Sequence, residues 1–290
     1  MNFCKKRRAY VMVKSGELVK SSYGKNYRAD FFVEWGSVTK LVTAHLIARL
    51  VEEGFLDWGT PACELVEVLP SRVTVHSLVT HSSGLPRVHP GMSSGVFSDP
   101  YKGADEAFIM QALRQIDEDS LDSVGSVEYS NLGYAVLALL VERATGRSWF
   151  DAARGFVLEP AGLGDVSTLP PTEMRAHING FDGRPHQPWD LGSSPYVAAG
   201  GLWSDLQTMA NYGAAAMEKG LFMAAESGWQ RRRDVYWHNG QTRDSGAFLA
   251  LIPECDVVVA SHTLAGLPGA ADRLGWELVE GWPGGQPAHS

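Results

Sequence analysis

Strand-like segments occupy the two ends of this chain, and helical segments fill the middle. Short runs of β-branched and aromatic residues bounded by Gly, Asn, Asp or Pro predict strands. They fall at residues 9–14, 17–22, 235–238, 247–252 and 257–262. The first two flank Ser15-Gly16 and predict a hairpin. We therefore predict an antiparallel sheet that is built from both termini and covered by helices on both faces.

The middle of the chain is mainly helical. Apolar residues recur at steps of three and four after Val38, which predicts a buried helix that ends at Gly54. Further helices are predicted at 74–80, 104–116, 132–145, 150–158, 204–217 and 270–281. The fold class is therefore α/β of the α+β type. We expect a single domain over residues 1–290, with a sheet lobe from about 1–85 and 200–290, a helical lobe from about 86–199, and a site in the groove between them.

A hydroxyl and an amine stand three residues apart in Ser37-Val38-Thr39-Lys40, at the predicted start of the helix that ends at Gly54. On a helix this spacing puts the two side chains about 60° apart around the axis. A serine hydroxyl is a weak nucleophile until a base takes its proton, and a lysine can be that base when burial lowers its pKa. Ser37 and Lys40 are therefore candidate catalytic residues for acyl transfer without metal or cofactor.

Other motifs offer weaker alternatives. Ser37 and Lys40 also fit a capping serine followed by a solvated lysine. A second Ser-x-x-Lys, Ser22 to Lys25, falls in a turn-prone stretch where the spacing has no helical meaning. Gly91–Gly95 fits the Gly-x-Ser-x-Gly nucleophile elbow but lacks the strand before it and the helix after it. The histidines include no His-Glu-x-x-His pattern, so we expect no metal site.

Tyr129 and Asn131 form a second candidate group, on a loop just before the predicted 132–145 helix. A phenol near a cationic amine has a lowered pKa and can pass protons on. An asparagine amide can bond both a lysine and a substrate carbonyl. The alternative is a core tyrosine with a satisfied hydroxyl and an asparagine that caps the helix.

A third group, Trp237-His238-Asn239-Gly240, lies at the end of a predicted strand. Asn-Gly is the strongest short signal for a hairpin turn, and Gly240 lets a ligand lie close to the backbone. The N–H of Gln241, paired with that of Ser37, is a candidate oxyanion hole. His238, Gly240 and Gln241 are therefore candidate substrate-binding residues, together with the Asn131 amide.

Taken in order, Ser37-x-x-Lys40, Tyr129-x-Asn131 and His238-x-Gly240 resemble the motifs of the serine β-lactamase-related family. That family includes class C β-lactamases, penicillin-binding carboxypeptidases and lactamase-like esterases. The similarity extends to connecting segments such as His76–Leu85 and covers roughly residues 10–265. It implies a β-lactamase/transpeptidase-like fold and a serine acyl-enzyme mechanism.

The resemblance also implies roles for the candidate residues. Lys40, with Tyr129, takes the Ser37 proton, and Ser37 attacks a carbonyl group. The N–H groups of Ser37 and Gln241 hold the oxyanion. Tyr129 then helps to protonate the leaving group, and water or another nucleophile removes the acyl group by the reverse path.

The sequence departs from the family pattern in three places. His238 stands where β-lactamases carry a lysine that attracts the substrate carboxylate, and a neutral histidine holds that anion less well. Residues 124–128 lack the usual Pro-Gly before Tyr129, and the helical lobe is short, which suggests an open groove. The histidine resembles the esterase and aminopeptidase members, and all three differences weigh against antibiotic hydrolysis.

Three functions remain open from the sequence. We expect a serine hydrolase that acts on a small-molecule ester, amide or lactam. The alternative is a cytoplasmic acyltransferase that moves an acyl group from Ser37 to an amine or alcohol in biosynthesis. It is favoured by the lack of an export signal and of the anion-attracting lysine. A non-catalytic binding protein on the same scaffold is disfavoured because Ser37, Lys40 and Tyr129 occur together.

Composition narrows the partners. The 290 residues carry a formal net charge of −8, so we expect no nucleic-acid partner. No run approaches the roughly 20 apolar residues of a membrane span. Three widely spaced cysteines, Cys4, Cys63 and Cys255, indicate reduced thiols and a cytoplasmic location. Arg231–Arg233 is expected in a surface loop, with a contact to an anionic substrate as the alternative, and the oligomeric state is left undetermined.

Overall fold

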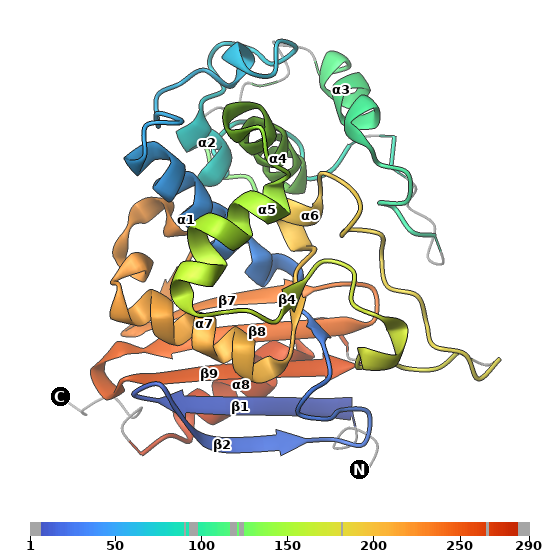
Figure 1. Ribbon diagram of the computed structural model, residues 1–290, viewed down its shortest axis with the longest axis vertical. Coiled ribbons are helices and arrows are strands. Elements are labelled where there is room, and N and C mark those ends of the chain that lie inside the picture. The colour runs from blue at the N-terminus through green and yellow to red at the C-terminus, as the bar shows by residue number, and fades with distance from the viewer. Residues whose placement is uncertain are drawn as a thin grey trace.

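The main sheet joins the two ends of the chain. The computed structural model describes residues 7–89, 91–92, 98–116, 121, 125–180, 182–264 and 267–283. Its six-stranded antiparallel sheet has the order β2-β1-β9-β8-β7-β6 (Figure 1). The strands are β1 (Arg8–Lys14), β2 (Glu17–Tyr23), β6 (Gln230–Arg232), β7 (Val235–Gln241), β8 (Ser245–Ile252) and β9 (Val257–Leu264). Because β1 pairs with β9 along its whole length, the predicted fold class is confirmed.

Helices cover both faces of the central strands β8 and β9, which are buried at every residue. On one face, Gly213 of α7 (Leu206–Glu218) lies against Val258. On the opposite face, Gly275 of α8 (Ala270–Glu280) lies against Phe248. Strands that are apolar at consecutive positions are typical of a sheet buried on both sides. The predicted coverage by helices on both faces is therefore correct.

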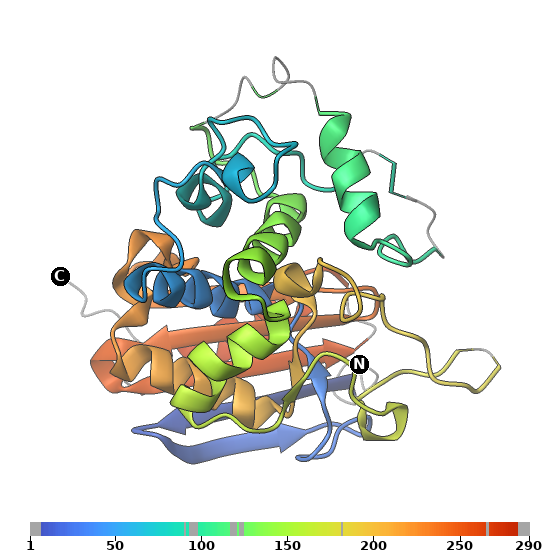
Figure 2. The same cartoon turned by 45° about the horizontal axis from the view of Figure 1, so that its top comes forward.

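A second group of helices lies on the far side of the molecule from β1 and β2 (Figure 2). It contains α2 (Val75–Val79), α3 (Glu106–Arg114) and α4 (Asn131–Thr145). Helix α4 is buried at every residue from Leu132 to Val141, because α1 (Thr39–Glu52), α2, α5 (Trp149–Ala153) and α6 (Val197–Gly200) pack around it. Helices of this kind, apolar all round, occur only in a protein interior or a membrane.

Helix α1 (Thr39–Glu52) connects the helical group to the sheet. It packs against α4, α5 and α6, and the turn that precedes it, Gly36–Val38, contacts strand β7. A small second sheet of order β3-β5-β4 lies beside this turn and pairs β3 (Val33–Glu34), β5 (Trp203–Ser204) and β4 (Val166–Ser167). These two-residue strands were not predicted, because so short a segment carries no periodic pattern.

Two predicted loops prove to be strands. Asn239 lies opposite Phe248 and Gly240 opposite Ala247, so the Asn-Gly pair is inside β7 and not in a hairpin turn. Arg231 and Arg232 belong to β6 because they pair with β7. The Arg232 guanidinium lies 4.4 Å from the centre of the Trp276 ring on α8.

Some sequence-based expectations have no test in this structure. Cys4 and the Ser93–Gly95 part of the Gly-x-Ser-x-Gly motif lie outside the described residues. The expected boundaries of the single domain and its two lobes stay a prediction.

The contact between α8 and the sheet can be tested at Gly275. A Cβ atom there would lie 2.1 Å from Phe248 Cδ1. Alanine gains about 1 kcal/mol of helix propensity over glycine, but overpacking a core costs about 1–3 kcal/mol. We expect Gly275→Ala to lower the free energy of unfolding in urea denaturation. Gly164→Ala, with nothing within 4 Å of its Cβ, is the control. A Gly275→Ala protein at least as stable as the parent would contradict this packing.

Candidate active site

Ser37 lies in a 3-10 turn, Gly36–Val38, that leads directly into α1. The Trp35 N–H donates to the Leu202 carbonyl at 2.9 Å, which fixes the turn to the segment before α7. Gly36 has a φ of 49°, a left-handed value that costs glycine little. Ser37 was predicted at the helix start and is found in the turn before it. Its Oγ nevertheless faces the Lys40 amine.

Lys40 is a buried amine with three uncharged partners. Only 1% of Lys40 is exposed to solvent. Its Nζ lies 3.3 Å from Ser37 Oγ, 2.8 Å from Asn131 Oδ1 and 2.6 Å from the Ala199 carbonyl oxygen. Burial, assisted by the positive charge of Arg87, lowers the pKa of Lys40 well below the usual 10.5. The predicted condition for a lysine base, a depressed pKa, is therefore met.

The three partners of Lys40 also suit its neutral form. The Asn131 side-chain oxygen and the Ala199 carbonyl can only accept hydrogen bonds, whereas the Ser37 hydroxyl can donate one. A neutral amine has two N–H groups for the two acceptors and one lone pair for the hydroxyl. In that state the lone pair faces the proton that Ser37 must lose before it can act as a nucleophile.

Tyr129 approaches the same hydroxyl from the loop before α4. Its OH donates to Ser37 Oγ at 2.6 Å. Burial raises the pKa of Tyr129 to about 12, although the hydrogen bond to Ser37 and the charge of Arg87 oppose this shift. The predicted lowering of this pKa is therefore wrong. The free energy needed to remove a phenolate from water exceeds the stabilisation that Ser37 and Arg87 give it. At neutral pH Tyr129 is a proton donor to Ser37.

Asn131 is held at both ends of its side-chain amide. Its Oδ1 accepts from Lys40, and its Nδ2 donates to the Tyr101 hydroxyl at 3.3 Å. The residue that caps α4 is Ser130, whose Oγ accepts the Gly133 N–H at 2.8 Å. The alternative role for Asn131 as the helix cap is therefore wrong, and its amide links Lys40 to an aromatic side chain.

Gly36 and Gly240 allow strand β7 to touch the turn that carries Ser37. A Cβ on Gly240 would lie 2.1 Å from the Trp35 carbonyl oxygen and 2.9 Å from Ser37 N. A Cβ on Gly36 would lie 3.0 Å from Gln241 N. The backbone nitrogens of Ser37 and Gln241 therefore both lie at this contact. Gly240 was predicted to make room for a ligand, but the space is taken by the Trp35 carbonyl of the chain itself.

A buried carboxylate holds the turn that follows Gln241. Glu34 Oε2 accepts from Thr242 Oγ1 at 2.8 Å and from Ser245 Oγ at 2.7 Å. The Gln241 side chain closes the same turn, since its Nε2 donates to the Ser245 carbonyl at 2.8 Å. Burial raises the pKa of Glu34, although the two hydroxyl hydrogen bonds oppose the shift. The position of the Gln241 backbone therefore depends on a residue of strand β3 that precedes Ser37 by three positions.

His238 lies on β7 and is buried. Its Nδ1–H donates to the Asn239 carbonyl at 2.7 Å. Burial, with a smaller contribution from the charge of Lys40, lowers the pKa of His238 to about 4, although the bond to Asn239 opposes this. The side chain is therefore uncharged at neutral pH. It cannot attract a carboxylate as a lysine at this position would.

Four further residues of the site were missed from the sequence: Glu34, His81, Arg87 and Tyr101. The His81 ring lies 4.5 Å from the Tyr129 ring, and the Arg87 guanidinium lies 5.1 Å from it. Both residues come from the segment after α2, far from Tyr129 in the sequence. One indication of His81 was present in the sequence, because it lies in the segment His76–Leu85 that resembles the family. That segment does not indicate that His81 contacts Tyr129.

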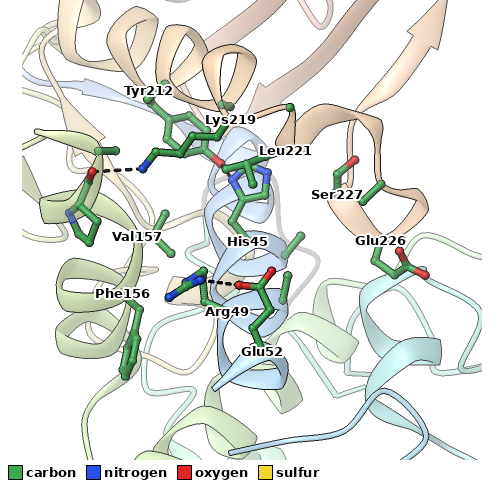
Figure 3. A pocket seen from close by; sticks show the side chains of 18 of the residues that line it. His45, Arg49, Glu52, Phe156, Val157, Tyr212, Lys219, Leu221, Glu226 and Ser227 are labelled. Atoms are coloured by element: carbon green, nitrogen blue, oxygen red, sulfur yellow. Dashed lines mark hydrogen bonds and ion pairs between the residues drawn. The ribbon is translucent and has the colours of Figure 1, made fainter. Parts of the chain in front are cut away.

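Cavity size does not identify the reaction centre. The space beside Ser37 is about 20 Å³ and is walled by Tyr101, Trp189 and Leu191, among others. It has room for about one water molecule. A much larger hollow of about 640 Å³ lies between α1, α7 and residues 155–161, with His45 and Tyr212 in its wall (Figure 3). Ser37, Lys40 and Tyr129 do not line that hollow.

Two general features of the described part of the chain bear on the site. In these ranges no three or more His, Cys, Asp and Glu side chains gather where they could hold a metal ion. None of the described helices has the length and apolar character needed to cross a membrane. The second Ser-x-x-Lys begins at Ser22 on strand β2, so its spacing is not helical, as expected.

Comparison with known proteins adds a family and a fold. The profile of the family described as Beta-lactamase matches residues 8–232. Penicillin-binding protein 4 of Amycolatopsis lactamdurans is 32% identical over 182 residues, which are 56% of this chain and 44% of that protein. Esterase EstB of Burkholderia gladioli is 28% identical over 181 residues, 56% of this chain and 45% of the esterase. The match thus spans less than half the length of these two relatives.

A solved structure extends the comparison to nearly the whole chain. The structure of a β-lactamase/D-alanine carboxypeptidase from Yersinia pestis, complexed with citrate, matches with a TM-score of 0.75 and 19% identity. The match covers 95% of this chain and 93% of that one. It shows a shared β-lactamase/transpeptidase-like fold, in agreement with the resemblance seen in the sequence.

The protonation of Lys40 predicts a pH dependence. Only the neutral amine accepts a proton, so the acylation rate of Ser37 should rise with pH through the pKa of Lys40, well below 10.5, and then level off. His81 and His238, with pKa values of about 3 and about 4, would instead produce a rise in that acidic range. Stopped-flow acylation by an activated ester would measure the profile. The same rise in a Lys40→Ala protein would contradict the assignment.

The contact between β7 and the Ser37 turn predicts the effect of Gly240→Ala. The added methyl group would meet the Trp35 carbonyl at 2.1 Å, so the Ser37 and Gln241 backbones must separate. Misplacement of a reacting group by about 1 Å can cost about 100-fold in rate. We expect a loss of acylation of that order, measured below the melting temperature of the variant. Gly164→Ala is the matched control, and an unchanged rate in Gly240→Ala would contradict the contact.

Proposed function

Because the chain belongs to the Beta-lactamase family, we propose that it is a serine hydrolase that forms an acyl-enzyme at Ser37 from an ester or amide. The observation that carries this proposal is the position of Ser37 Oγ, 3.3 Å from Lys40 Nζ and 2.6 Å from the Tyr129 hydroxyl. A hydroxyl between a depressed-pKa amine and a phenolic donor has both the base and the acid that acyl transfer needs.

Acylation begins with proton transfer from Ser37 to the neutral Lys40 amine. Ser37 Oγ forms a bond to the substrate carbonyl carbon, and the carbonyl oxygen becomes an oxyanion. The N–H groups of Ser37 and Gln241 are the donors proposed to stabilise it. When the bond to the leaving group breaks, Tyr129 gives that group a proton. The Lys40 ammonium then returns a proton to Tyr129, so both side chains end in their starting states.

Deacylation follows the reverse path with water as the nucleophile. The water gives a proton to Lys40, directly or through Tyr129, and its oxygen forms a bond to the acyl carbon. The ester bond to Ser37 then breaks, and Ser37 Oγ takes a proton back. The high pKa of Tyr129 suits this role, because the phenol stays protonated until a strongly basic oxygen or nitrogen develops beside it.

The space beside Ser37 has aromatic walls. The adjacent space of about 20 Å³ is walled by Tyr101 and Trp189, whose ring centres are 5.5 Å apart. Asp99 fixes these walls, because its carboxylate accepts the Tyr101 N–H at 3.0 Å and the Asp190 N–H at 2.8 Å. The neutral His238 offers no charge for a carboxylate. Ester and amide substrates agree with the names of two matched proteins, an esterase and a β-lactamase/D-alanine carboxypeptidase.

Transfer of the acyl group to an amine or alcohol instead of water stays a prediction, as does the cytoplasmic location. The Ser37 centre would serve either reaction, because the two differ only in the nucleophile that resolves the acyl-enzyme. The non-catalytic alternative is opposed by the buried Lys40 amine. A binding protein has no use for an amine whose pKa is depressed beside a hydroxyl.

Intact-protein mass spectrometry would test the proposal. We expect incubation with a panel of esters, amides and lactams to add one acyl mass. Ser37→Ala should show no adduct, and Lys40→Ala should lose acylation nearly as fully, because the two residues act as a unit. No adduct from any compound on a folded protein, or an adduct that persists in Ser37→Ala, would contradict the proposal. Product analysis with added amines then separates hydrolysis from transfer.

A further inference from the structure

We propose that His81 is a positioning residue that fixes the Tyr129 hydroxyl against Ser37. The inference rests on the proposed function only in that Tyr129 is taken as the proton donor at Ser37. His81 lies in the segment that follows α2, and Tyr129 lies in the loop before α4. Several bonds join the two segments, among them the Gly125 N–H to the Ser82 carbonyl at 2.8 Å and Ser130 Oγ to the Pro86 carbonyl at 2.7 Å. His81 is the residue that contacts Tyr129 and both of its chain neighbours, and it touches neither Ser37 nor a substrate in the proposed mechanism.

His81 contacts three consecutive residues of the Tyr129 loop. Its carbonyl oxygen accepts the Glu128 N–H at 2.8 Å. Its ring lies 4.5 Å from the Tyr129 ring, with 32° between the planes. Its Nδ1 accepts the Ser130 N–H at 3.1 Å. Backbone bonds on both sides of Tyr129 and a ring contact to Tyr129 itself leave the phenol little freedom to turn away from Ser37.

The His81 ring is itself fixed by a second aromatic residue. Tyr134 of α4 lies 4.9 Å from it, and the Tyr134 hydroxyl donates to the Val79 carbonyl at 3.0 Å. The imidazole therefore has tyrosines from one loop and one helix as neighbours. Since Tyr134 is almost fully buried, the ring of His81 is held by a rigid part of the core.

The backbone of His81 also adopts a conformation that needs support. Its φ is 59°, in the left-handed region, which is uncommon for residues other than glycine even though asparagine, aspartate and histidine enter it more often than most. Such strain persists only where the surroundings enforce it, and it concentrates at functional sites. Here the next residue is anchored, because the Ser82 N–H donates to the Ser77 carbonyl at 2.8 Å. The left-handed turn aims both the carbonyl and the ring of His81 at the Tyr129 loop.

A histidine can do this without adding charge to the site. Burial, and then the charges of Lys40 and His238, lower the pKa of His81 to about 3. Its Nδ1 therefore stays an acceptor for the Ser130 N–H, and the ring adds no positive charge beside Lys40. A lysine or arginine here would have no lone pair for that N–H and would repel the Lys40 ammonium formed during acylation.

The test compares His81→Ala, His81→Asn and the control His76→Ala, all measured by Ser37 acylation. We expect His81→Ala to slow acylation by about 10- to 100-fold, since displaced catalytic groups cost rates of this size. Asparagine tolerates the left-handed backbone and offers an oxygen to the Ser130 N–H, so His81→Asn should recover much of the rate. His76 is half-exposed and pairs with Glu226, so its loss should change acylation less than about 2-fold.

A double-mutant cycle with Tyr129→Phe separates positioning from general destabilisation. If His81 acts through the Tyr129 hydroxyl, His81→Ala should cost less than about 2-fold further in the Tyr129→Phe background. The proposal would be overturned if the fold-losses in acylation rate of the two single variants multiply in the double variant. A folded His81→Ala protein with the parent acylation rate would also overturn it.

A crystal structure of His81→Ala keeps this test independent of the proposed function. We expect the distance from the Tyr129 hydroxyl to Ser37 Oγ to lengthen from 2.6 Å beyond hydrogen-bonding range. An unchanged distance would overturn the role of His81 even if no substrate is found. Failure of the parent protein to acylate with any compound would instead count against the proposed function.

Discussion

The site depends on the burial of one amine. Lys40 is surrounded by a hydroxyl, an amide oxygen and a backbone carbonyl, and these come from three separate elements, the turn before α1, the start of α4 and the end of α6. A charged ammonium loses its hydration there, and hydrogen bonds to uncharged partners offset that loss only in part. The neutral form therefore becomes accessible, and its lone pair is directed at Ser37. Packing of α4 and α6 against α1 is thus what gives an ordinary side chain its chemistry.

The second constraint is the contact between β7 and the turn that carries Ser37. Two glycines, Gly36 and Gly240, let the backbones touch, and Glu34 fixes the turn beyond them through Thr242 and Ser245. The sheet therefore contributes a backbone nitrogen to the site, while the helices contribute side chains. Neither group alone contains a complete centre, because Ser37 and Lys40 lie where the helical group and the sheet meet.

Local sequence was sufficient for much of this arrangement. Ser37, Lys40, Tyr129 and Asn131 could be found because each pair falls within one turn or one short loop, and the pairing of the terminal strands followed from their positions. Properties set by distant contacts could not be found. The pKa of Tyr129 depends on burial by segments from elsewhere in the chain. Asn239-Gly240 forms a strand because β8 pairs with it. His81 and Glu34 act on residues far away in the sequence, and no local pattern indicates their partners.

The pairing of β1 with β9 has a consequence for synthesis on the ribosome. Lys14 lies opposite Val257 and Arg8 opposite Thr263, so about 240 residues must be translated before β1 acquires its inner neighbour. Until then the nascent hairpin of β1 and β2 carries an apolar face and an unpaired edge, a state in which strands associate with other chains. Nearly all of the helical group emerges during that interval. The late synthesis of β9 should therefore determine how strongly the nascent chain depends on chaperones and how often it is truncated during expression.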